Sequence, residues 1–360
     1  MEDNAKTIMT VRGPISPEDA GLTLIHEHLV FDGSCFCFSG GEPGAPSFAG
    51  ESVTMERLGA LRRNVMCMAD NGKVVDIDFL VEAALAFKER GGGTIVDVTL
   101  DEIGRNVVDL RTISEKSGLN IVAGMGHYVH YSHPKSLEEE SLESIADRML
   151  REVVEGVGDT GIRPGILGEL GTSSTLHPNE EKVLRASARV SAQTGISMTL
   201  HMDPGGYIAP HVLDILEAEG ADPRRVVFGH LDLSINRDDT ASDDPIWYIR
   251  EVAKRGAYVA LDTFGEENWY ASGLVSGQKA LMLPSDDQRM RAVLRLLEEG
   301  FVNQTLISQD VCVKTSHVRY GGFGYGYILE YIAPQLRAYG VNDFEIDRMM
   351  SVNTRNVLAF

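Results

Sequence analysis

A pair of histidines near the N-terminus, His26 and His28, has the spacing of a metal site. Both lie in an apolar, β-rich run at residues 22–30. Side chains two residues apart on a strand point to the same face, so the two imidazoles can bind one ion together. Neutral imidazole suits zinc and its neighbours, and carboxylate oxygen suits harder ions. The pair therefore predicts a metal site, although a half-exposed strand could also carry both histidines without one.

Acidic and imidazole side chains also occur near the ends of other predicted strands. Glu169 lies in the apolar run GILGELG, where a carboxylate must be paired or bound to a cation. Six candidate ligands lie near the carboxyl ends of predicted strands: His26, His28, Glu169, His201, His230 and Asp310. One catalytic ion normally uses fewer than six such ligands. Two ions about 3.5–4 Å apart, bridged by a carboxylate and a hydroxide, would use all six.

The segments that must position these residues alternate between short β-rich runs and longer stretches of helical period. Several helical stretches end in glycine just before the next strand, as helix C-caps do. Eight strands alternating with helices favour an α/β fold, the (β/α)8 TIM barrel, in which the carboxyl ends of the strands meet at one mouth. The predicted strands cover residues 22–30, 92–100, 119–128, 164–170, 195–203, 224–232, 256–265 and 304–312.

An open, doubly wound sheet is the alternative architecture. It usually carries a glycine-rich phosphate turn after its first strand, and HEHLVFDG is not such a turn. No internal repeat, low-complexity tract or interdomain linker is evident, so residues 1–360 are predicted to form one domain. The stretch from Gly33 to Gly50, rich in Gly, Pro and Ser, is predicted to be a long loop after the first strand.

Composition narrows the range of partners and compartments. The formal net charge is −20 and no basic run occurs, which argues against nucleic acid. The longest apolar runs are far shorter than the ~20 residues of a membrane span, and no signal peptide is visible. Four cysteines without a regular framework indicate a reduced, cytoplasmic protein. We expect a cytoplasmic protein that binds a small-molecule substrate but neither nucleic acid nor a membrane; a homodimer is compatible with the sequence.

Seven segments along nearly the whole chain match one known family. They are TLIHEHLV (23–30), GILGELGTS (165–173), the strand-end His201, FGHLD (228–232), LDTFG (261–265), ISQD (307–310) and YGGFGYGYIL (320–329). With these segments the chain resembles the phosphotriesterase-like branch of the amidohydrolase superfamily. The resemblance implies a binuclear centre, with His26, His28 and Asp310 at the more buried ion and His201 and His230 at the more exposed one. Zinc is the first candidate metal, and manganese, cobalt and iron are alternatives.

Glu169 narrows the resemblance to one subclass. Many members of the family bridge their ions with a carboxylated lysine on the fourth strand, whereas glutamate stands at the matching position here. The segments GELGTS, YGGFGYGYIL and FDGSCFC most resemble the phosphotriesterase-related proteins. That wider group includes lactonases, carboxylesterases and an amidase that cleaves N-acetyltaurine. The resemblance therefore implies hydrolysis of a carboxylic ester or lactone, or of an N-acyl amide such as an N-acetyl amino acid or N-acetyltaurine; an organophosphate triester is the alternative substrate.

Two residues are predicted to be catalytic in such a reaction. The ions would lower the pKa of a shared water, and Asp310 could take its proton and deliver it to the leaving group. Tyr128 matches a family tyrosine that lies beside the metals, and it could donate a hydrogen bond to the substrate or only pack at the barrel mouth. Asp232 and Asp262 could support the ligands or contact substrate. Arg105 is expected in a salt bridge, with an anionic substrate group as the alternative.

Two other interpretations remain open. A non-catalytic small-ligand-binding barrel should have lost at least one of the six ligands, and none is missing. A mononuclear amidohydrolase would not need Glu169. The chain departs from the family at Asn353-Thr354, where Asn-Pro is usual, and at Gln309, where His or Ser is more usual and hydrogen bonding behind the ligands could change. Simple surface roles are predicted for His130, His133, His177, His211 and His317.

Overall fold

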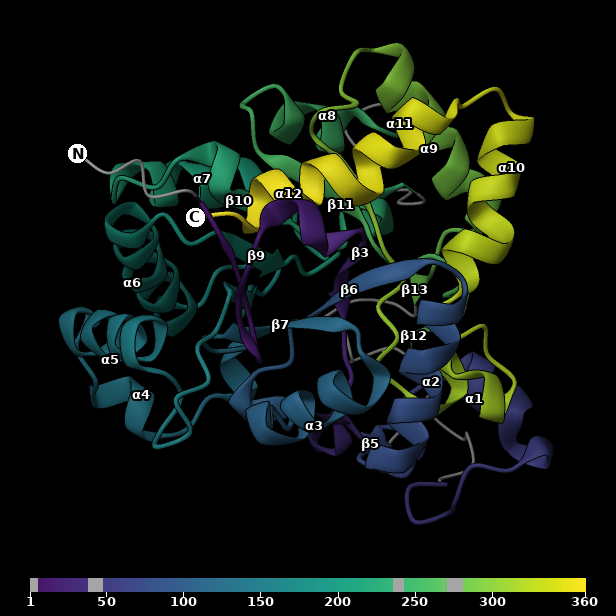
Figure 1. Ribbon diagram of the computed structural model, residues 1–360, viewed down its shortest axis with the longest axis horizontal. Coiled ribbons are helices and arrows are strands. Elements are labelled where there is room, and N and C mark those ends of the chain that lie inside the picture. Colours follow the sequence, from purple (N-terminus) through teal and green to yellow (C-terminus); the bar gives the residue numbers. More distant parts are fainter. Residues whose placement is uncertain (1–5, 38–47, 236–242, 268, 271–280) are drawn as a thin grey trace.

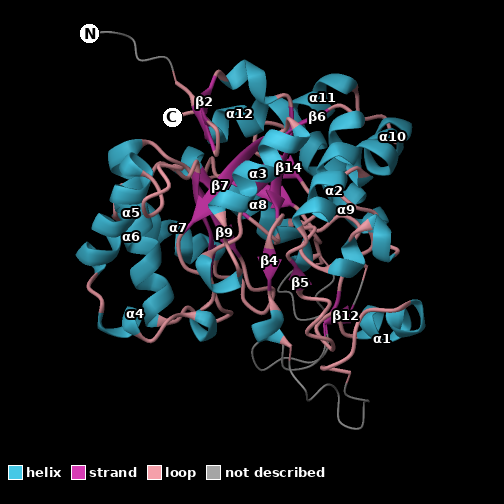
Figure 2. Ribbon diagram, turned by 60° about the horizontal axis from the view of Figure 1, so that its bottom comes forward, coloured by secondary structure: helices cyan, strands magenta, loops and turns pink. Residues whose placement is uncertain are grey.

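The eight apolar runs of the sequence form eight parallel strands at the centre of the protein (Figure 2). The computed structural model describes residues 6–37, 48–235, 243–267, 269–270 and 281–360. The strands are β3 (Leu22–Glu27), β6 (Gly92–Asp97), β7 (Asn120–Met125), β8 (Ile166–Gly171), β9 (Met198–His201), β10 (Val226–Phe228), β11 (Tyr258–Leu261) and β14 (Thr305–Ile307). Their spatial order follows their sequence order, which confirms the predicted (β/α)8 TIM barrel.

The two edge strands, β3 and β14, approach each other beside the candidate ligands. The backbone N–H of His26 donates to Ser308 Oγ at 3.2 Å, and the N–H of Asp310 donates to the carbonyl oxygen of His26 at 3.3 Å. The buried carboxylate of Glu27 accepts hydrogen bonds from Ser308 Oγ at 2.7 Å and from the N–H of Val311 at 2.8 Å. The contacts that close the barrel therefore also hold Asp310 in place next to His26.

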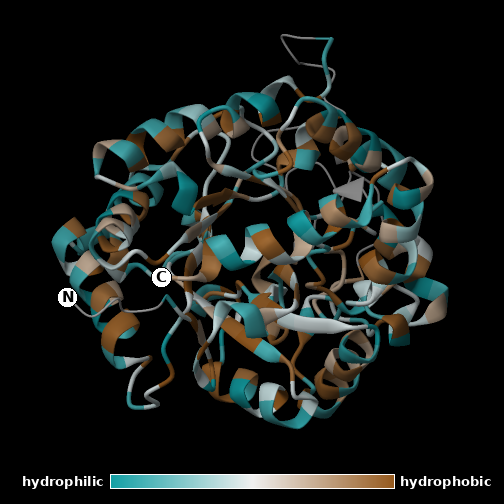
Figure 3. Ribbon diagram, turned by 45° about the horizontal axis from the view of Figure 1, so that its top comes forward, coloured by the Kyte–Doolittle hydropathy of each residue, from teal (hydrophilic) through white to brown (hydrophobic). Residues whose placement is uncertain are grey.

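Each strand is followed by a helix whose ends match signals in the sequence. In the longest helix, Pro178 supplies a backbone angle suited to the first turn, and Gly195 ends the helix in a left-handed conformation (φ 79°). Hydrophobic and hydrophilic residues alternate along the helices that surround the sheet (Figure 3). The helices are α1 (Leu58–Arg63), α2 (Ile77–Glu89), α3 (Val107–Ser117), α4 (Ser136–Glu139), α5 (Leu142–Glu155), α6 (Pro178–Thr194), α7 (Ala209–Ala218), α8 (Trp247–Ala253), α9 (Asp286–Glu298), α10 (Ala333–Ala338), α11 (Asp343–Asp347) and α12 (Asn353–Leu358).

The C-terminal segment closes the barrel at the starts of the strands (Figure 1). The Asn353 side chain, at the start of α12, donates to the carbonyl oxygen of Thr305 at 2.9 Å. The Arg225 guanidinium donates to the carbonyl oxygens of Val357 at 3.0 Å and Ala359 at 2.8 Å. The opposite end, at the carboxyl ends of the strands, is left for the site. The apolar side chains packed inside the barrel include Ile8, Ile25, Val96, Val122, Ile166, Val227, Ala260, Leu306 and Leu358.

In the described part of the chain, three short antiparallel pairs of strands lie outside the eight-stranded sheet. They are β1 (Ile8–Thr10) with β2 (Gly13–Ile15), β4 (Phe31–Asp32) with β5 (Lys73–Val74), and β12 (Trp269–Tyr270) with β13 (Leu281–Met282). The long loop predicted from Gly33 to Gly50 falls partly outside the described residues, since 38–47 are not among them. Among the helices that the structure describes, none combines the length and the apolar character needed to cross a bilayer.

Candidate metal centre

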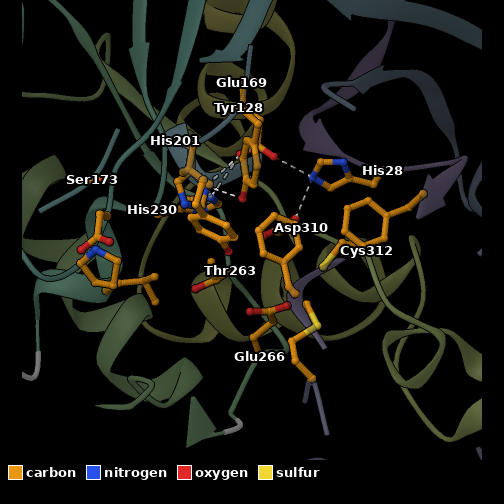
Figure 4. Close-up of a pocket in the computed structure, with 18 of the residues that line it drawn as sticks. His28, Tyr128, Glu169, Ser173, His201, His230, Thr263, Glu266, Asp310 and Cys312 are labelled. Carbon is orange, nitrogen blue, oxygen red and sulfur yellow. Dashed lines mark hydrogen bonds and ion pairs between the residues drawn. The ribbon is translucent and has the colours of Figure 1, made fainter. Parts of the chain in front are cut away.

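Glu169, near the carboxyl end of β8, lies between His28 on one side and His201 and His230 on the other (Figure 4), and it also contacts His26. Its Oε1 atom lies 3.2 Å from His28 Nε2. Its Oε2 atom lies 3.3 Å from His26 Nε2, 3.1 Å from His201 Nδ1 and 3.5 Å from His230 Nε2. Burial would raise the pKa of this carboxyl, but hydrogen bonds from the surrounding imidazoles hold it well below its usual range. The central acid is therefore a carboxylate shared by four imidazoles.

Asp310 completes the cluster just beyond β14. Its Oδ1 atom lies 3.3 Å from His28 Nε2. Asp310 (φ 53°) and His230 (φ 57°) are the only non-glycine residues with positive φ in the described part of the chain. The left-handed conformation costs such residues ~1–2 kcal/mol and persists where the surroundings impose it, often at functional sites. Backbone strain therefore occurs at two candidate ligands, as expected for a site under functional constraint.

The donor atoms fit two metal ions that share one carboxylate. Ligand atoms of His26, His28 and Glu169 lie within 4.8 Å of one another, and so do those of Glu169, His201 and His230. The Nε2 atom of His26, which faces the cluster, is buried without a hydrogen-bond partner of good geometry, and His201 Nδ1 lies only 3.0 Å from His230 Nε2. Buried polar atoms rarely remain unsatisfied. Imidazole and carboxylate donors that converge in this way suit zinc and similar divalent ions.

Asp262, whose role the sequence left open, supports two of the histidines from behind. Its Oδ2 atom lies 2.9 Å from His26 Nδ1, and its Oδ1 atom lies 3.0 Å from His230 Nδ1. His28 Nδ1 is held in the same way by Thr99 Oγ1 at 2.8 Å. A carboxylate or hydroxyl bound to the far ring nitrogen fixes the orientation of an imidazole whose other nitrogen faces a metal. The Nε2 atoms of these three histidines all point toward the cluster.

Asp232 and Arg105, also left open by the sequence, are occupied elsewhere. Asp232 Oδ2 accepts hydrogen bonds from Arg289 Nε at 2.7 Å and from Thr263 Oγ1 at 2.5 Å, and all three side chains are buried. Arg105 Nη1 lies 3.2 Å from Glu152 Oε2, so its side chain forms a salt bridge. Both residues thus stabilise the segments that follow the strands.

Gln309, one of the departures from the family pattern, does not face the cluster. Its Nε2 atom donates to the carbonyl oxygen of Gly324 at 3.2 Å, and its Oε1 atom accepts from the N–H of Ile328 at 2.8 Å. Its backbone N–H donates to Glu27 Oε1 at 3.0 Å. Burial raises the pKa of Glu27 to about 7. Gln309 therefore ties the segment that carries Asp310 to the glycine-rich stretch that follows it.

Tyr128 lines a pocket of about 430 Å³ whose walls also include the cluster residues His28, Glu169, His201, His230 and Asp310. Its Oη atom lies 3.1 Å from His201 Nδ1. Burial, and then the charge of Glu169, raise the pKa of Tyr128 well above its usual value, so the hydroxyl keeps its proton and can donate it in a hydrogen bond. None of the described residues that line this pocket is a lysine or an arginine. Its apolar walls include Phe31, Phe36, Met66, Tyr131 and Leu233.

Comparison with known proteins identifies the family. A sequence model described as the phosphotriesterase family matches residues 6–358. The chain belongs to the phosphotriesterase family. Its relatives in this family include the N-acetyltaurine hydrolase of Xenopus tropicalis, 33% identical over 98% of each chain, and the phosphotriesterase-related protein of Nematostella vectensis, 34% identical over 98% of each chain. The crystal structure of a resiniferatoxin-binding protein from Rhodobacter sphaeroides is 36% identical, with a TM-score of 0.91 over 98% of this chain and 94% of that one.

The match confirms the resemblance seen in the sequence and the expected enzyme class. This phosphotriesterase-family chain is a metal-dependent hydrolase, as both the family and the names of its relatives indicate.

Several residues of this phosphotriesterase-family site could not be recognised from the sequence. Glu266, in the polar stretch after β11, is 7% exposed and lines the pocket together with Cys312. Burial, and then the neighbouring Asp310, raise the pKa of Glu266 well above its usual value. His127 precedes Tyr128 in the chain, and its Nδ1 atom lies 2.5 Å from Glu102 Oε1. Glu102 and Glu266 follow predicted strands in polar stretches, and His127 lies at the end of a predicted strand, so the local sequence does not show which partners they meet.

The prediction of a simple surface role was wrong for His317. Its side chain is 1% exposed, and its ring packs against Phe79 (centroids 4.9 Å apart) and Tyr325 (5.5 Å apart). Burial lowers the pKa of His317 to about 4. His130 also differs from the expectation, because it lines the pocket and its Nδ1 atom lies 3.1 Å from Ser173 Oγ. Aromatic neighbours distant in sequence cover His317, and the local sequence does not show them.

Replacing Asp262 with asparagine is expected to lower metal affinity about 10–100-fold. Asparagine is neutral and has only one side-chain oxygen, so it cannot replace the charged carboxylate that holds both His26 and His230. The two imidazole rings therefore lose their fixed orientation. Competition titration against a chromophoric chelator measures the change. The control is Asp287→Asn, which removes a half-exposed carboxylate on α9. Unchanged affinity in Asp262→Asn would contradict the supporting role.

The thermal stability of the metal-free protein should fall as pH rises from about 6.5 through 9. Burial alone would lower the pKa of His28, but hydrogen bonds with Asp310 and Glu169 raise it to about 9. A raised histidine pKa stabilises the fold fully below the unfolded value of ~6.5 and no longer does so above the folded value. Metal binding needs neutral imidazole and therefore strengthens over the same range. The gap in Tm between metal-loaded and chelator-treated protein should widen between pH 6.5 and 9; a constant or narrowing gap would argue against metal binding at His28.

Proposed function

We propose that this protein hydrolyses an N-acyl amide at a centre that holds two divalent metal ions. The observation that carries the proposal is the geometry around Glu169, where two groups of donor atoms share one carboxylate. The substrate class is suggested by the relative from Xenopus tropicalis, which is named an N-acetyltaurine hydrolase and matches along 98% of this chain. N-Acetyltaurine and N-acetyl amino acids are therefore the first candidate substrates, ahead of esters and lactones.

The proposal assigns the ligands in two sets. His26, His28 and Asp310 would hold one ion, and His201 and His230 would hold the other, with Glu169 bridging both. Two bound cations, with zinc as the first candidate, would acidify an attacking water and polarise the scissile carbonyl. The imidazoles supported by Asp262 and Thr99 are oriented before any ion binds, so little reorganisation is needed.

Asp310 and Tyr128 are assigned the steps that protein groups perform. Asp310 lies at the cluster, and its Oδ1 atom is buried without a hydrogen-bond partner of good geometry. It can accept the proton of the attacking water and return it to the leaving nitrogen, which an amide requires more strictly than an ester does. Tyr128 retains its hydroxyl proton and can donate a hydrogen bond to the carbonyl oxygen as negative charge develops there.

A substrate panel tests the proposed bond type. Metal-loaded protein is assayed with N-acetyltaurine, N-acetyl amino acids, N-acyl amides with longer apolar acyl groups, lactones, aryl esters and an organophosphate triester. The longer acyl groups test whether the aromatic and aliphatic walls of the pocket select the acyl side. We expect an amide to have a kcat/KM at least ~10-fold above that of the triester. Turnover confined to lactones, esters or the triester would refute the amide assignment.

A non-catalytic ligand-binding barrel is the second candidate. It is favoured by the name of the solved relative from Rhodobacter sphaeroides, a resiniferatoxin-binding protein with a TM-score of 0.91. The six candidate ligands are all present in this chain, which favours catalysis. Saturable binding of panel compounds by metal-loaded protein, with turnover of none of them, would support the binding function instead.

A further inference from the structure

Glu266 is a buried carboxyl group with no partner in the described part of the protein. Its side chain lines the pocket and is 7% exposed, yet no described residue donates a hydrogen bond to its carboxyl oxygens. Its oxygens face the open pocket, and a ligand that fills the pocket would displace water from them, which is costly without a compensating hydrogen bond. A ligand that enters the pocket could supply the missing partner.

The backbone around Glu266 is held firmly. Its N–H donates to the carbonyl oxygen of Thr263 at 3.0 Å, and its own carbonyl oxygen accepts from Arg289 Nη2 at 2.8 Å. Arg289 is fully buried and is itself held by Asp232 and by Asp286, whose Oδ1 atom lies 3.0 Å from Arg289 Nη1. These hydrogen bonds fix the backbone at Glu266 and therefore the place where its side chain meets the pocket.

Glu266 lies on the Asp310 side of the pocket, whereas Tyr128 lies beside His201 (Figure 4). Ligand atoms of Glu266, Asp310 and Cys312 lie within 4.8 Å of one another. In the proposed reaction Asp310 returns a proton to the leaving nitrogen, so the leaving group passes close to Glu266. Tyr128 would donate its hydrogen bond to the carbonyl oxygen from the opposite side of the pocket.

The chemistry of the pocket indicates what Glu266 binds. No lysine or arginine occurs among the described lining residues, so none of them offers this carboxyl a cationic partner, and a donor on the substrate can take that place. An amide differs from the corresponding ester by one N–H group at the leaving atom, and a carboxyl oxygen accepts a hydrogen bond from it. A site that hydrogen-bonds a substrate N–H discriminates strongly against analogues that lack it.

We propose that Glu266 is a specificity-determining residue that accepts a hydrogen bond from the N–H of the leaving group and so favours amides over esters. The inference rests on the proposed amide hydrolysis and adds the residue that selects the bond. It requires no third metal ion, although Glu266, Asp310 and Cys312 are near enough to one another to raise that alternative.

A matched pair of substrates tests the inference directly. N-Acetyltaurine and O-acetylisethionate differ only in N–H against O at the leaving atom. Glu266→Leu is expected to lower kcat/KM for the amide about 10–100-fold and for the ester less than ~3-fold. Glu266→Gln retains a carbonyl acceptor and should lower the amide value less than ~10-fold. If N-acetyltaurine is not a substrate, the pair is rebuilt on whichever N-acyl amide the wild type cleaves best.

Controls separate this role from folding and metal binding. The exposed neighbour Glu267, whose Oε1 atom accepts the N–H of Asp286 at 2.8 Å, is changed to glutamine as the matched variant and should behave as wild type. Tm and metal content are measured for every variant. Equal losses with amide and ester, no loss with either, or loss of a bound ion in Glu266→Leu would each overturn the inference. A wild type that cleaves esters but none of the amides would refute the proposed function itself, and the inference with it.

Discussion

Glu169→Gln is expected to lose at least one bound metal ion per chain and to lower kcat/KM by at least ~10³-fold. The carboxylate lies within 3.5 Å of four imidazole nitrogens, one at Oε1 and three at Oε2. Glutamine is the same size but neutral, and only its oxygen can bind a cation, so it cannot bridge two ions. In the proposed centre each ion would contribute several kcal/mol of charge stabilisation to the transition state, which corresponds to ~10³ in rate.

The measurement combines elemental analysis of the purified variant with steady-state kinetics. Glu181→Gln is the matched control, because it makes the same substitution on α6, where the glutamate side chain is 39% exposed and pairs with Arg185. Retention of two ions and of turnover in Glu169→Gln would refute the bridging role. Retention of one ion with high activity would favour the mononuclear alternative.

Asp310→Asn is expected to lower kcat/KM for an amide by about 10³–10⁴-fold. The substitution would weaken a proposed ion ligand and remove the group proposed to carry the proton, and general acid–base catalysis alone contributes ~10²–10⁴-fold. An aryl ester should lose at least ~10-fold less than the amide, because an aryl oxide leaves without protonation. The dependence on the leaving group separates proton transfer from metal loss, which affects both substrates.

Kinetics of both substrates with the same metal-loaded preparations test this expectation. Asp287→Asn serves again as the control, since it removes a carboxylate from the outer face of α9. Equal losses for amide and aryl ester would mean that Asp310 acts only as a ligand. Full activity with both would exclude it from the reaction.

The positions of the candidate ligands could be predicted because they conflict with their local surroundings. A glutamate inside GILGELG and histidines inside TLIHEHLV are costly to bury, and a βα alternation brings the ends of such strands to one mouth. The structure places His26 and Glu169 in contact as that logic requires. Strand lengths were overestimated, because apolar side chains continue beyond the last ladder hydrogen bond into the loops.

The sequence names Asp262 as a possible support, but which ligands it holds could not be predicted, because that depends on which segments are neighbours in space. Asp262 binds His26 from the first strand and His230 from the sixth strand, a relation that no local pattern contains. Glu266 follows a strand in a polar stretch that predicts an exposed side chain, and the hydrogen bond from Arg289 to its carbonyl oxygen joins segments that are distant in the sequence. His317 was misjudged for the same reason.

Elemental analysis of the purified protein, prepared without added chelator, tests the two-ion centre most directly. The geometry around Glu169 predicts about two divalent ions per chain, lost together with activity on chelation and restored together by zinc, manganese or cobalt. Full hydrolytic activity in protein that contains no metal, or only one ion per chain, would contradict the proposed centre.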